Sequence, residues 1–399
     1  MIRRILVIGS IGLALAGGAR FALHELAERA WEKRRQALLA EALFQPELRR
    51  PWEIRFDALQ ERMRSSPRFA EIRDSAYRPH TAWGAGEPRA LNDFEKVWVE
   101  SAWGELDVLD SILEDLRALA PRDLAWSGPT VGLLSLRECT NALCARAWIA
   151  LEDDDQERMA RAYSDALRLA RATDDGTAVG TAARSACEGI ALRSVRSALA
   201  LGASAGALRA ALTPLLADWT YTPERGERCI RRDLAILEDF HPEEGESGAQ
   251  KRRECDSARA WLAPVEKALR LAREPVARTP WACKVHSQVS RDRNDDDMEH
   301  LSWDSWTLGI KLLHERHAVR NVVLTALSVA AFHTEHDAWP ASLSDLDDLP
   351  AEHALDTLTG APLPYTLEAN GARVGPASFC ERTATWQGEG EPVYVWTLR

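Results

Sequence analysis

Two pairs of histidines have a spacing at which their imidazoles could bind a metal ion. His314 and His317 are three residues apart, as are His333 and His336, so in a helix each pair lies on one side. His333 follows His314 by 19 residues, which is roughly 28 Å along a continuous helix, so the two pairs cannot share one ion. An isolated histidine pair is more often hydrogen-bonded structure, and we therefore predict no metal ligands among the four.

Two acidic segments offer the oxygen ligands that calcium prefers. Segment 152–155 consists of consecutive carboxylates and precedes a helical pattern, whose first turn such residues stabilise, so we interpret it as a helix-capping turn. Segment 292–297 looks like the start of an EF-hand loop. However, its sixth position is Asp297 where the loop needs Gly, and its twelfth is Trp303 where the loop needs Glu. We place it in a polar linker or long loop, 276–300.

Short motifs of common catalytic and nucleotide-binding sites are missing from the sequence. It has no G-x-S-x-G, no P-loop, no G-x-G-x-x-G and no H-E-x-x-H. Gly176 and Gly180 have an isolated small-residue spacing, which favours close helix packing over a phosphate cradle. Carboxylates are plentiful, but no two of them stand out as an acid–base pair. We predict no catalytic, cofactor-binding or metal-binding residue and no cofactor.

Seven cysteines are spread along the chain without a C-x-x-C pair, which argues against a zinc ribbon or a thioredoxin-type site. Cys187 shares a helical stripe with small apolar residues and is predicted to lie in the core. Cys229, Cys255 and Cys283 flank adjacent predicted helices and could supply one disulfide in an oxidising compartment. The remaining cysteines are Cys139, Cys144 and Cys380, and the odd total leaves at least one thiol free.

Composition excludes several classes of protein. The 399 residues exceed one ordinary domain, and 46% hydrophobic with 28% charged residues can form a core, which excludes a disordered chain. A net charge of -11 argues against general nucleic-acid binding, which needs a basic face. The 15 tryptophans are scattered from Trp31 to Trp396 and are expected in the core, with exposed partner-binding anchors as the alternative.

Residues 1–23 at the N-terminus are predicted to form a targeting segment. Arg3 and Arg4 form a short basic region before the uncharged run 5–18, which is shorter than the roughly 20 residues that span a bilayer. Extension of the run to Leu23 includes Arg20, which could snorkel at a helix end. The segment is thus either a cleaved signal, with small-x-small sites ending at Ala16 or Ala19, or an uncleaved anchor. The alternative is a buried N-terminal helix of a cytosolic protein.

The orientation of the chain across the membrane depends on whether the basic residues before or behind the apolar run dominate. Basic residues behind the apolar run outnumber those before it, which favours a cytoplasmic body, whereas a signal-type start favours export. We expect export, with a single anchor in the bacterial inner membrane and a periplasmic body. The basic residues behind the run are Arg20, Arg29, Lys33, Arg34 and Arg35.

Helical periodicity dominates the body from residue 24 to about 275. The first strong helix, 92–119, has Asn92 as N-cap and Glu95 completing a capping box. After the acidic turn, Met159, Tyr163, Ala166, Leu167 and Ala170 form one face. Further helices are expected at 131–151, from the turn at 174–176 to about 201, and at 205–217, 223–240, 249–274 and 303–335.

The helix pair at 139–172 resembles a tetratricopeptide-type hairpin. The expected Gly before the acidic turn is absent, and no period of about 34 residues extends into neighbouring segments. The resemblance therefore covers one or two degenerate units, and a generic helical hairpin is the alternative. The matching residues are Ala145, Ala147, Leu151, the acidic turn, Ala162, Tyr163, Ala166 and Leu167.

The C-terminal region contains a loop, His336-Asp337-Ala338-Trp339-Pro340 followed by Ser342-Leu343, a segment from Asp356 to Tyr365 with Thr359-Gly360, and a turn at Asn370-Gly371. Residues 320–375 resemble the C-terminal half of the type II secretion major pseudopilin. The resemblance implies a helix, a loop, a tight turn and a small antiparallel sheet, to which Val393, Val395 and Leu398 could add an edge strand.

This sequence departs from the pseudopilin pattern at three places. Thr357 replaces the usual Pro, Leu358 stands where Phe is common, and the N-terminus has no processing site with a following Glu, so pilus assembly is not expected. The whole arrangement resembles a loose group of uncharacterised bacterial envelope proteins.

The sequence therefore predicts a mainly α protein. Its expected parts are a targeting segment at 1–23, a helical bundle or short tetratricopeptide-like array at 24–275, a linker at 276–300 and a small α+β module at 301–399. The leading functional hypothesis is a non-enzymatic, envelope-anchored protein with a protein partner, contacting the membrane through its N-terminal segment and binding no nucleic acid. The alternatives are an envelope hydrolase and an accessory component of a secretion or pilus-like system.

Overall fold

A computed structural model describes residues 49–66, 107–121, 133–174, 176–217, 222–239, 298–357, 360–375 and 396–398, with a few single positions between them. The targeting segment 1–23, nearly all of the linker 276–300 and most of the expected helix 249–274 lie outside them. Within the described residues, no helix is both long and apolar enough to cross a membrane.

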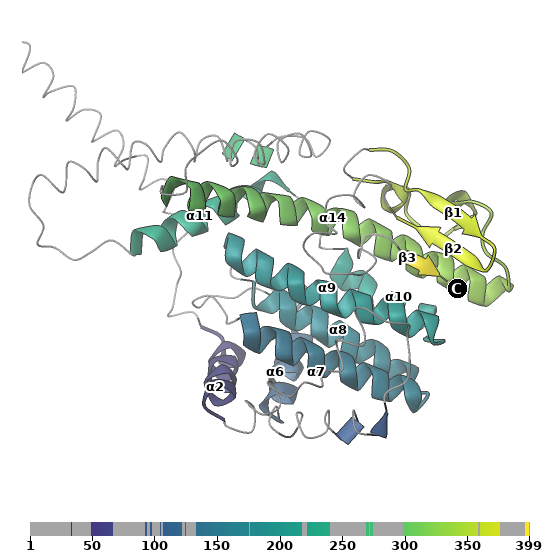
Figure 1. Cartoon of the computed structure of the whole chain (residues 1–399), viewed down its shortest axis with the longest axis horizontal. Coiled ribbons are helices and arrows are strands. Elements are labelled where there is room, and N and C mark those ends of the chain that lie inside the picture. Colours follow the sequence, from purple (N-terminus) through teal and green to yellow (C-terminus); the bar gives the residue numbers. More distant parts are fainter. Residues whose placement is uncertain are drawn as a thin grey trace, which may run out of the picture.

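The described part of the chain is 74% helical, which confirms the predicted mainly α class with a small sheet near the C-terminus. The helices lie in stacked layers, with the long helix of the C-terminal region along one side and the sheet at its far end (Figure 1). The elements that precede this region are α2 (Pro51–Ser65), α6 (Asp107–Ala118), α7 (Leu133–Glu152), α8 (Gln156–Ala172), α9 (Ala178–Ala200), α10 (Ala205–Leu216) and α11 (Pro223–Asp239).

Helices α7 and α8 form the predicted hairpin, and the acidic segment between them is a capping turn, as expected. Asp154 adopts a left-handed conformation with φ of 57°, and the carboxylate of Asp155 accepts a hydrogen bond from the backbone N–H of Arg158 at 2.9 Å. The predicted apolar face of α8 is buried throughout, including Met159, Tyr163 and Ala166. Local capping thus sets the start of α8, and burial of its stripe holds it against α7.

Helix α9 lies between the α7–α8 hairpin and α14 (Met298–His336), as Figure 1 shows. It begins where the Thr177 hydroxyl accepts a hydrogen bond from the N–H of Gly180 at 2.9 Å. The turn before it needs Gly176, whose φ is 77° and over which the Arg232 side chain of α11 packs. Close helix packing was predicted at Gly176 and Gly180. Gly176 lies in the turn before α9 rather than within a helix, and close packing at Gly180 stays a prediction.

Helix α14 is 39 residues long and begins five residues before the expected Trp303. It contacts α9, α10 and α11 as well as β2 and β3, so it joins the helical body to the C-terminal sheet. It ends at His336, after which Asp337 takes a φ of 53°, a left-handed position typical of helix C-termini.

The C-terminal module follows the expected order of helix, loop, turn and antiparallel sheet. Two short 3-10 helices, η4 (Leu343–Asp345) and η5 (Ala351–Ala354), precede the strands β1 (Tyr365–Glu368), β2 (Gly371–Val374) and β3 (Trp396–Leu398), which lie in this order in the sheet. Gly360 has the predicted positive φ, 70°, and its N–H donates to the Asp356 carbonyl at 2.7 Å.

The hairpin between β1 and β2 forms where it was expected, but its turn residues are shifted by one position. Glu368 pairs with Gly371, so the two loop residues are Ala369 and Asn370 rather than Asn370 and Gly371. Neither loop residue has a positive φ, so the turn does not use the left-handed conformation that Asn-Gly supports. Leu398 lies in the expected additional strand, whereas Val393 and Val395 fall outside the described residues.

One hydrophobic core runs from α2 to β3. It contains residues of both the helical part and the C-terminal module, such as Trp52, Trp148, Leu327 and Trp396. The three tryptophans among these are buried, which confirms their expected place in the core. The parts predicted as 24–275 and 301–399 therefore share one interior, because α14 packs on the helices and on the sheet.

We predict that Gly176→Ala destabilises the protein more than Gly202→Ala does. Both glycines have a positive φ, 77° and 92°, which costs an L-residue roughly 1–2 kcal/mol. A Cβ at Gly176 would also lie 3.1 Å from the Arg232 guanidinium, whereas one at Gly202 would meet nothing within 4 Å. Urea unfolding of both variants measures the difference, and equal losses would show that Arg232 gives way freely.

Candidate functional site

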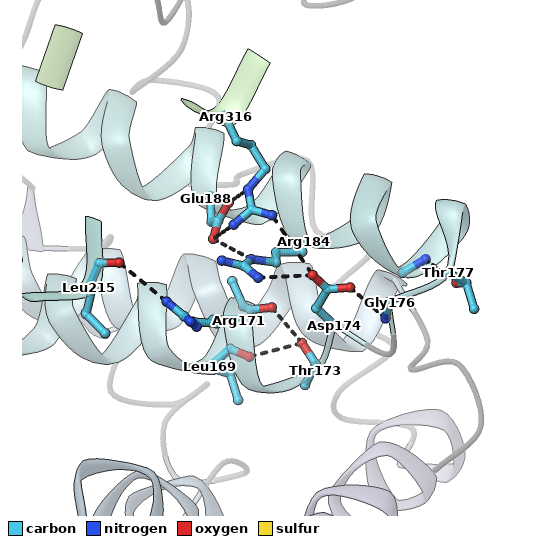
Figure 2. Close-up of polar contacts among 12 residues, drawn as sticks. Leu169, Arg171, Thr173, Asp174, Gly176, Thr177, Arg184, Glu188, Leu215 and Arg316 are labelled. Carbon is cyan, nitrogen blue, oxygen red and sulfur yellow. Dashed lines mark hydrogen bonds and ion pairs between the residues drawn. The ribbon is translucent and has the colours of Figure 1, made fainter. Parts of the chain in front are cut away.

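Charged side chains from three parts of the chain meet in the interior beside α9 (Figure 2). Arg184 and Glu188 stand one turn apart on α9, Asp174 comes from the α8–α9 turn, and Arg316 comes from α14. The side chains of Arg184 and Arg316 are 9% exposed and that of Glu188 is 2% exposed. We call these four residues the ionic cluster.

Glu188 is the centre of the ionic cluster. Its carboxylate accepts hydrogen bonds from Arg316 Nε at 2.7 Å and Nη2 at 3.2 Å, and from Arg184 Nε at 2.6 Å. The two bonds from Arg316 engage both carboxylate oxygens, the fork geometry that makes arginine–carboxylate pairs strong. A contact across 128 positions of sequence therefore connects α9 to α14.

Asp174 connects the same arginines to the turn that precedes α9. One of its carboxylate oxygens accepts from the N–H of Gly176 at 2.9 Å, and the other accepts from Arg184 Nη1 at 3.0 Å. Arg316 Nη1 lies 4.0 Å from this second oxygen. Burial raises the pKa of Asp174, but the charges of Arg184 and Arg316 outweigh it and hold the pKa below its ordinary value. The carboxyl is therefore ionised at neutral pH.

The arginines stay protonated despite their burial. Burial and the charge of Arg184 lower the pKa of Arg316 to about 10, which is still well above neutral pH. Arg171, in the last turn of α8, has its pKa lowered to about 9 by burial and by Arg184, Arg316 and Arg225. Its Nη1 reaches the Leu215 carbonyl near the end of α10 at 3.5 Å. A third cation thus lies next to the ionic cluster.

The ionic cluster has a structural role, which is to hold three segments of the chain together. The oxygens of Glu188 and Asp174 accept from guanidinium or backbone N–H groups, and Asp174 does not titrate near neutral pH as a general acid or base would. The cluster joins the α8–α9 turn, α9 and α14 in one geometry, because each carboxylate must stay in reach of its partners once it is out of water.

A second buried polar centre lies at Ser194 on α9. Its hydroxyl accepts from Trp148 Nε1 of α7 at 2.8 Å and lies 2.9 Å from the hydroxyl of Tyr163 of α8. Burial raises the pKa of Tyr163 well above its ordinary value, so this hydroxyl stays neutral. The three side chains join α7, α8 and α9 through hydrogen bonds inside an apolar core.

The described cysteines are buried. Cys187 lies in the core as predicted, and Cys139, Cys144 and Cys187 are free thiols. Burial raises the pKa of Cys144 and of Cys187 to about 12, which suppresses the thiolate that nucleophilic catalysis requires. Cys229 is also buried. Its proposed partners Cys255 and Cys283 lie outside the described residues, so that disulfide stays a prediction.

The four candidate histidines divide into two unlike pairs. His314 is 1% exposed, and burial lowers the pKa of both His314 and His317 to about 4. His333 instead stacks on Trp339 at a centroid distance of 3.9 Å, and His336 stacks on Phe332 at 4.0 Å. Among the described residues, no three His, Cys, Asp or Glu side chains come together as a metal site would require.

The ionic cluster was not among the features predicted from the sequence. The available signal was Arg184 and Glu188, which are four residues apart within the predicted helix that ends near residue 201, among small residues such as Ala183, Cys187 and Ala191. Charges at such positions usually face solvent. Comparison with known protein families, with curated proteins and with solved structures found no match.

We predict that Glu188→Gln costs about 3–5 kcal/mol of unfolding free energy, the usual loss when one partner of a buried ion pair is removed. The amide would leave the two buried guanidinium groups of Arg184 and Arg316 with the single carboxylate of Asp174 in the ionic cluster. Chemical denaturation measures the loss.

The matched control for this variant is Glu157→Gln on α8. Glu157 forms an ion pair with Arg161 one turn away, but its side chain is 84% exposed, so water replaces the lost charge and stability stays near the wild-type value. Equal stability of the two variants would contradict the role assigned to the ionic cluster.

Proposed function

We propose that this protein is a non-enzymatic scaffold of the bacterial envelope, anchored in the inner membrane by its N-terminal segment, with a periplasmic body that binds another protein. The observation that carries the proposal is the ionic cluster, which joins α9, α14 and the α8–α9 turn. Buried ion pairs contribute little net stability compared with apolar packing, but they permit few alternative arrangements. A body held in one arrangement suits a protein that presents a fixed surface to a partner.

Exposed apolar side chains supply contact points for such a partner. Val179 at the start of α9 is 61% exposed, Ile54 on α2 is 56% exposed and Leu367 on β1 is 49% exposed. Large apolar side chains at a surface contribute the most binding free energy when a partner covers them. They lie on different elements, so they mark positions to probe rather than one interface.

The proposed location depends on the sequence of the N-terminus. The basic residues Arg3 and Arg4 followed by the apolar run 5–18 are typical of signal and anchor segments. Small-x-small sites at Ala16 and Ala19 support cleavage, and extension of the run to Leu23 supports an anchor.

A second candidate function is an accessory role in a secretion or pilus-like system. It is favoured by the order of elements after α14, namely a loop, the tight turn from Asp356 to Gly360 and a small antiparallel sheet, which is the order that the pseudopilin resemblance implies. A fold-level likeness of this kind is an analogy for function. Deletion of the gene with no change in secretion would count against this role.

We predict that alkaline phosphatase fused after residue 45 is active in a bacterial host, because this enzyme needs the oxidising periplasm to form its disulfides. The same fusion lacking residues 1–23 is the control and should be inactive. Separation of membrane and soluble fractions then distinguishes an anchor from a cleaved signal. An inactive full fusion, together with a fluorescent cytoplasmic reporter at the same site, would refute export.

We also predict that a photo-crosslinking amino acid at Val179 or Leu367 gives a discrete adduct in intact cells, because these side chains are exposed and apolar. Glu157, which is exposed and charged, is the control position. A scaffold should give an adduct of constant mass at one or both apolar positions and none at Glu157. Identical adducts at all three positions, or none at all, would contradict the scaffold proposal.

A further inference from the structure

Strand β1 has one edge that pairs with β2 and one edge that no described strand covers. The N–H of Gly375 donates to the carbonyl of Pro364 at 3.1 Å, so residues 364, 366 and 368 direct their backbone groups toward β2. Because this direction alternates along a strand, the N–H and C=O groups of Tyr365 and Leu367 point to the other edge. Among the residues that the structure describes, none pairs with these four groups.

The segment before η5's end begins to cover this edge and then leaves it. Leu363, two residues before Tyr365 on the same edge, donates its N–H to the carbonyl of Ala354 at 2.7 Å. Leu355 and Pro362 form an isolated antiparallel bridge. Residues 351–354 then form η5 instead of a strand, so the pairing stops short of Tyr365.

Helix α14 holds η5 in this position. The side-chain amide of Asn321 donates to the carbonyls of Glu352 and Leu355 at 2.9 and 2.8 Å, and the Thr325 hydroxyl donates to the carbonyl of His353 at 3.0 Å. Asn321 and Thr325 are fully buried, so water does not compete for these bonds. The edge of β1 therefore stays open in the folded protein.

The side chains of β1 favour pairing at this edge. Tyr365 and Leu367 lie on the inner face of the sheet, since they pair with the buried Val374 and Ala372 of β2. Leu367 is nevertheless 49% exposed, because β1 is the strand farthest from α14 (Figure 1). Residues 365–368 contain no Lys, Pro or bulge, which are the features that protect many edge strands from pairing.

A second copy of β1 fits this edge in antiparallel orientation. With Thr366 on a twofold axis, Tyr365 of each copy lies opposite Leu367 of the other, and the two pairs exchange four backbone hydrogen bonds. Each Leu367 then packs beside a tyrosine ring, a favourable cross-strand pair. Glu368, the one charged residue of β1, lies opposite Pro364, so no like charges meet. The missing N–H of Pro364 is not needed, because that position faces β2.

We propose that the open edge of β1 is a self-association site, at which two copies of this chain join their sheets side by side. A second copy is favoured over an unrelated extended peptide, because its own sequence satisfies the side-chain pairings that this register requires. Each copy contributes four strand residues, against about 20–30 residues a side in a standard interface, so the dimer is transient and depends on concentration. This inference stands apart from the proposed scaffold function, because it is tested without any other protein.

The test is disulfide trapping of the purified full chain carrying Thr366→Cys, under mild oxidation at rising protein concentration. On the twofold axis the two Cα atoms would be about 4.5 Å apart, within the range that a disulfide spans. We expect at least about tenfold more covalent dimer on a non-reducing gel than from the wild-type chain, whose native cysteines set the background. Addition of Leu367→Pro removes one outward N–H and leaves the bonds to β2 in place, so it should lower the dimer yield at least about fivefold.

The matched control is Arg373→Cys, an exposed position that pairs with Thr366 from β2 on the same face of the sheet. It lies one strand further from the axis, so the two copies of this cysteine would be roughly 14 Å apart and should stay unlinked. Circular dichroism checks that each variant is folded. Three results would overturn the proposal: no dimer above background with Thr366→Cys, an equal yield with Arg373→Cys, or an unchanged yield when a folded Leu367→Pro variant is combined with Thr366→Cys.

Discussion

Charged side chains that a helix buries among other helices need partners of opposite charge within reach. Helix α9 is such a helix, since α7, α8 and α14 all pack on it, and it carries Arg184 and Glu188 facing the interior. Removal of two ions from water costs several kcal/mol each unless partners with good geometry replace the water. Arg316 and Asp174 are those partners, so the position of α14 and the shape of the α8–α9 turn both depend on this requirement.

Buried polar contacts lie on two sides of α9, toward the α7–α8 hairpin and toward α14. Ser194 connects α9 to Trp148 and Tyr163 on the hairpin side, and Glu188 connects it to α14 on the other. Apolar packing alone tolerates small rotations and shifts of helices, because it has no direction. Hydrogen bonds in a dry interior do not tolerate them, since an unmade bond costs more than a made one contributes.

Helix α14 makes a different kind of polar contact on each of two sides. On the α9 side the charges are permanent at physiological pH, because the neighbouring arginines hold the pKa of Asp174 below its ordinary value. On the η5 side the polar contact is made by Asn321 and Thr325, whose side chains donate to the backbone carbonyls of Glu352, Leu355 and His353. These groups do not titrate, so neither of the two contacts depends on a proton near neutral pH.

Features that depend on neighbouring residues were determined by the sequence itself. The capping turn at Asp155, the buried stripe from Met159 to Ala170, the positive φ at Gly360 and the mainly α class all follow from interactions within a few positions. Tertiary structure alone decided the rest. Glu188 and Arg316 read as two ordinary surface charges until packing brings them together across 128 positions, and the separate domains expected from the sequence share one core. The reason is that capping and periodicity are local, whereas burial of a charge is decided by which distant helix covers it.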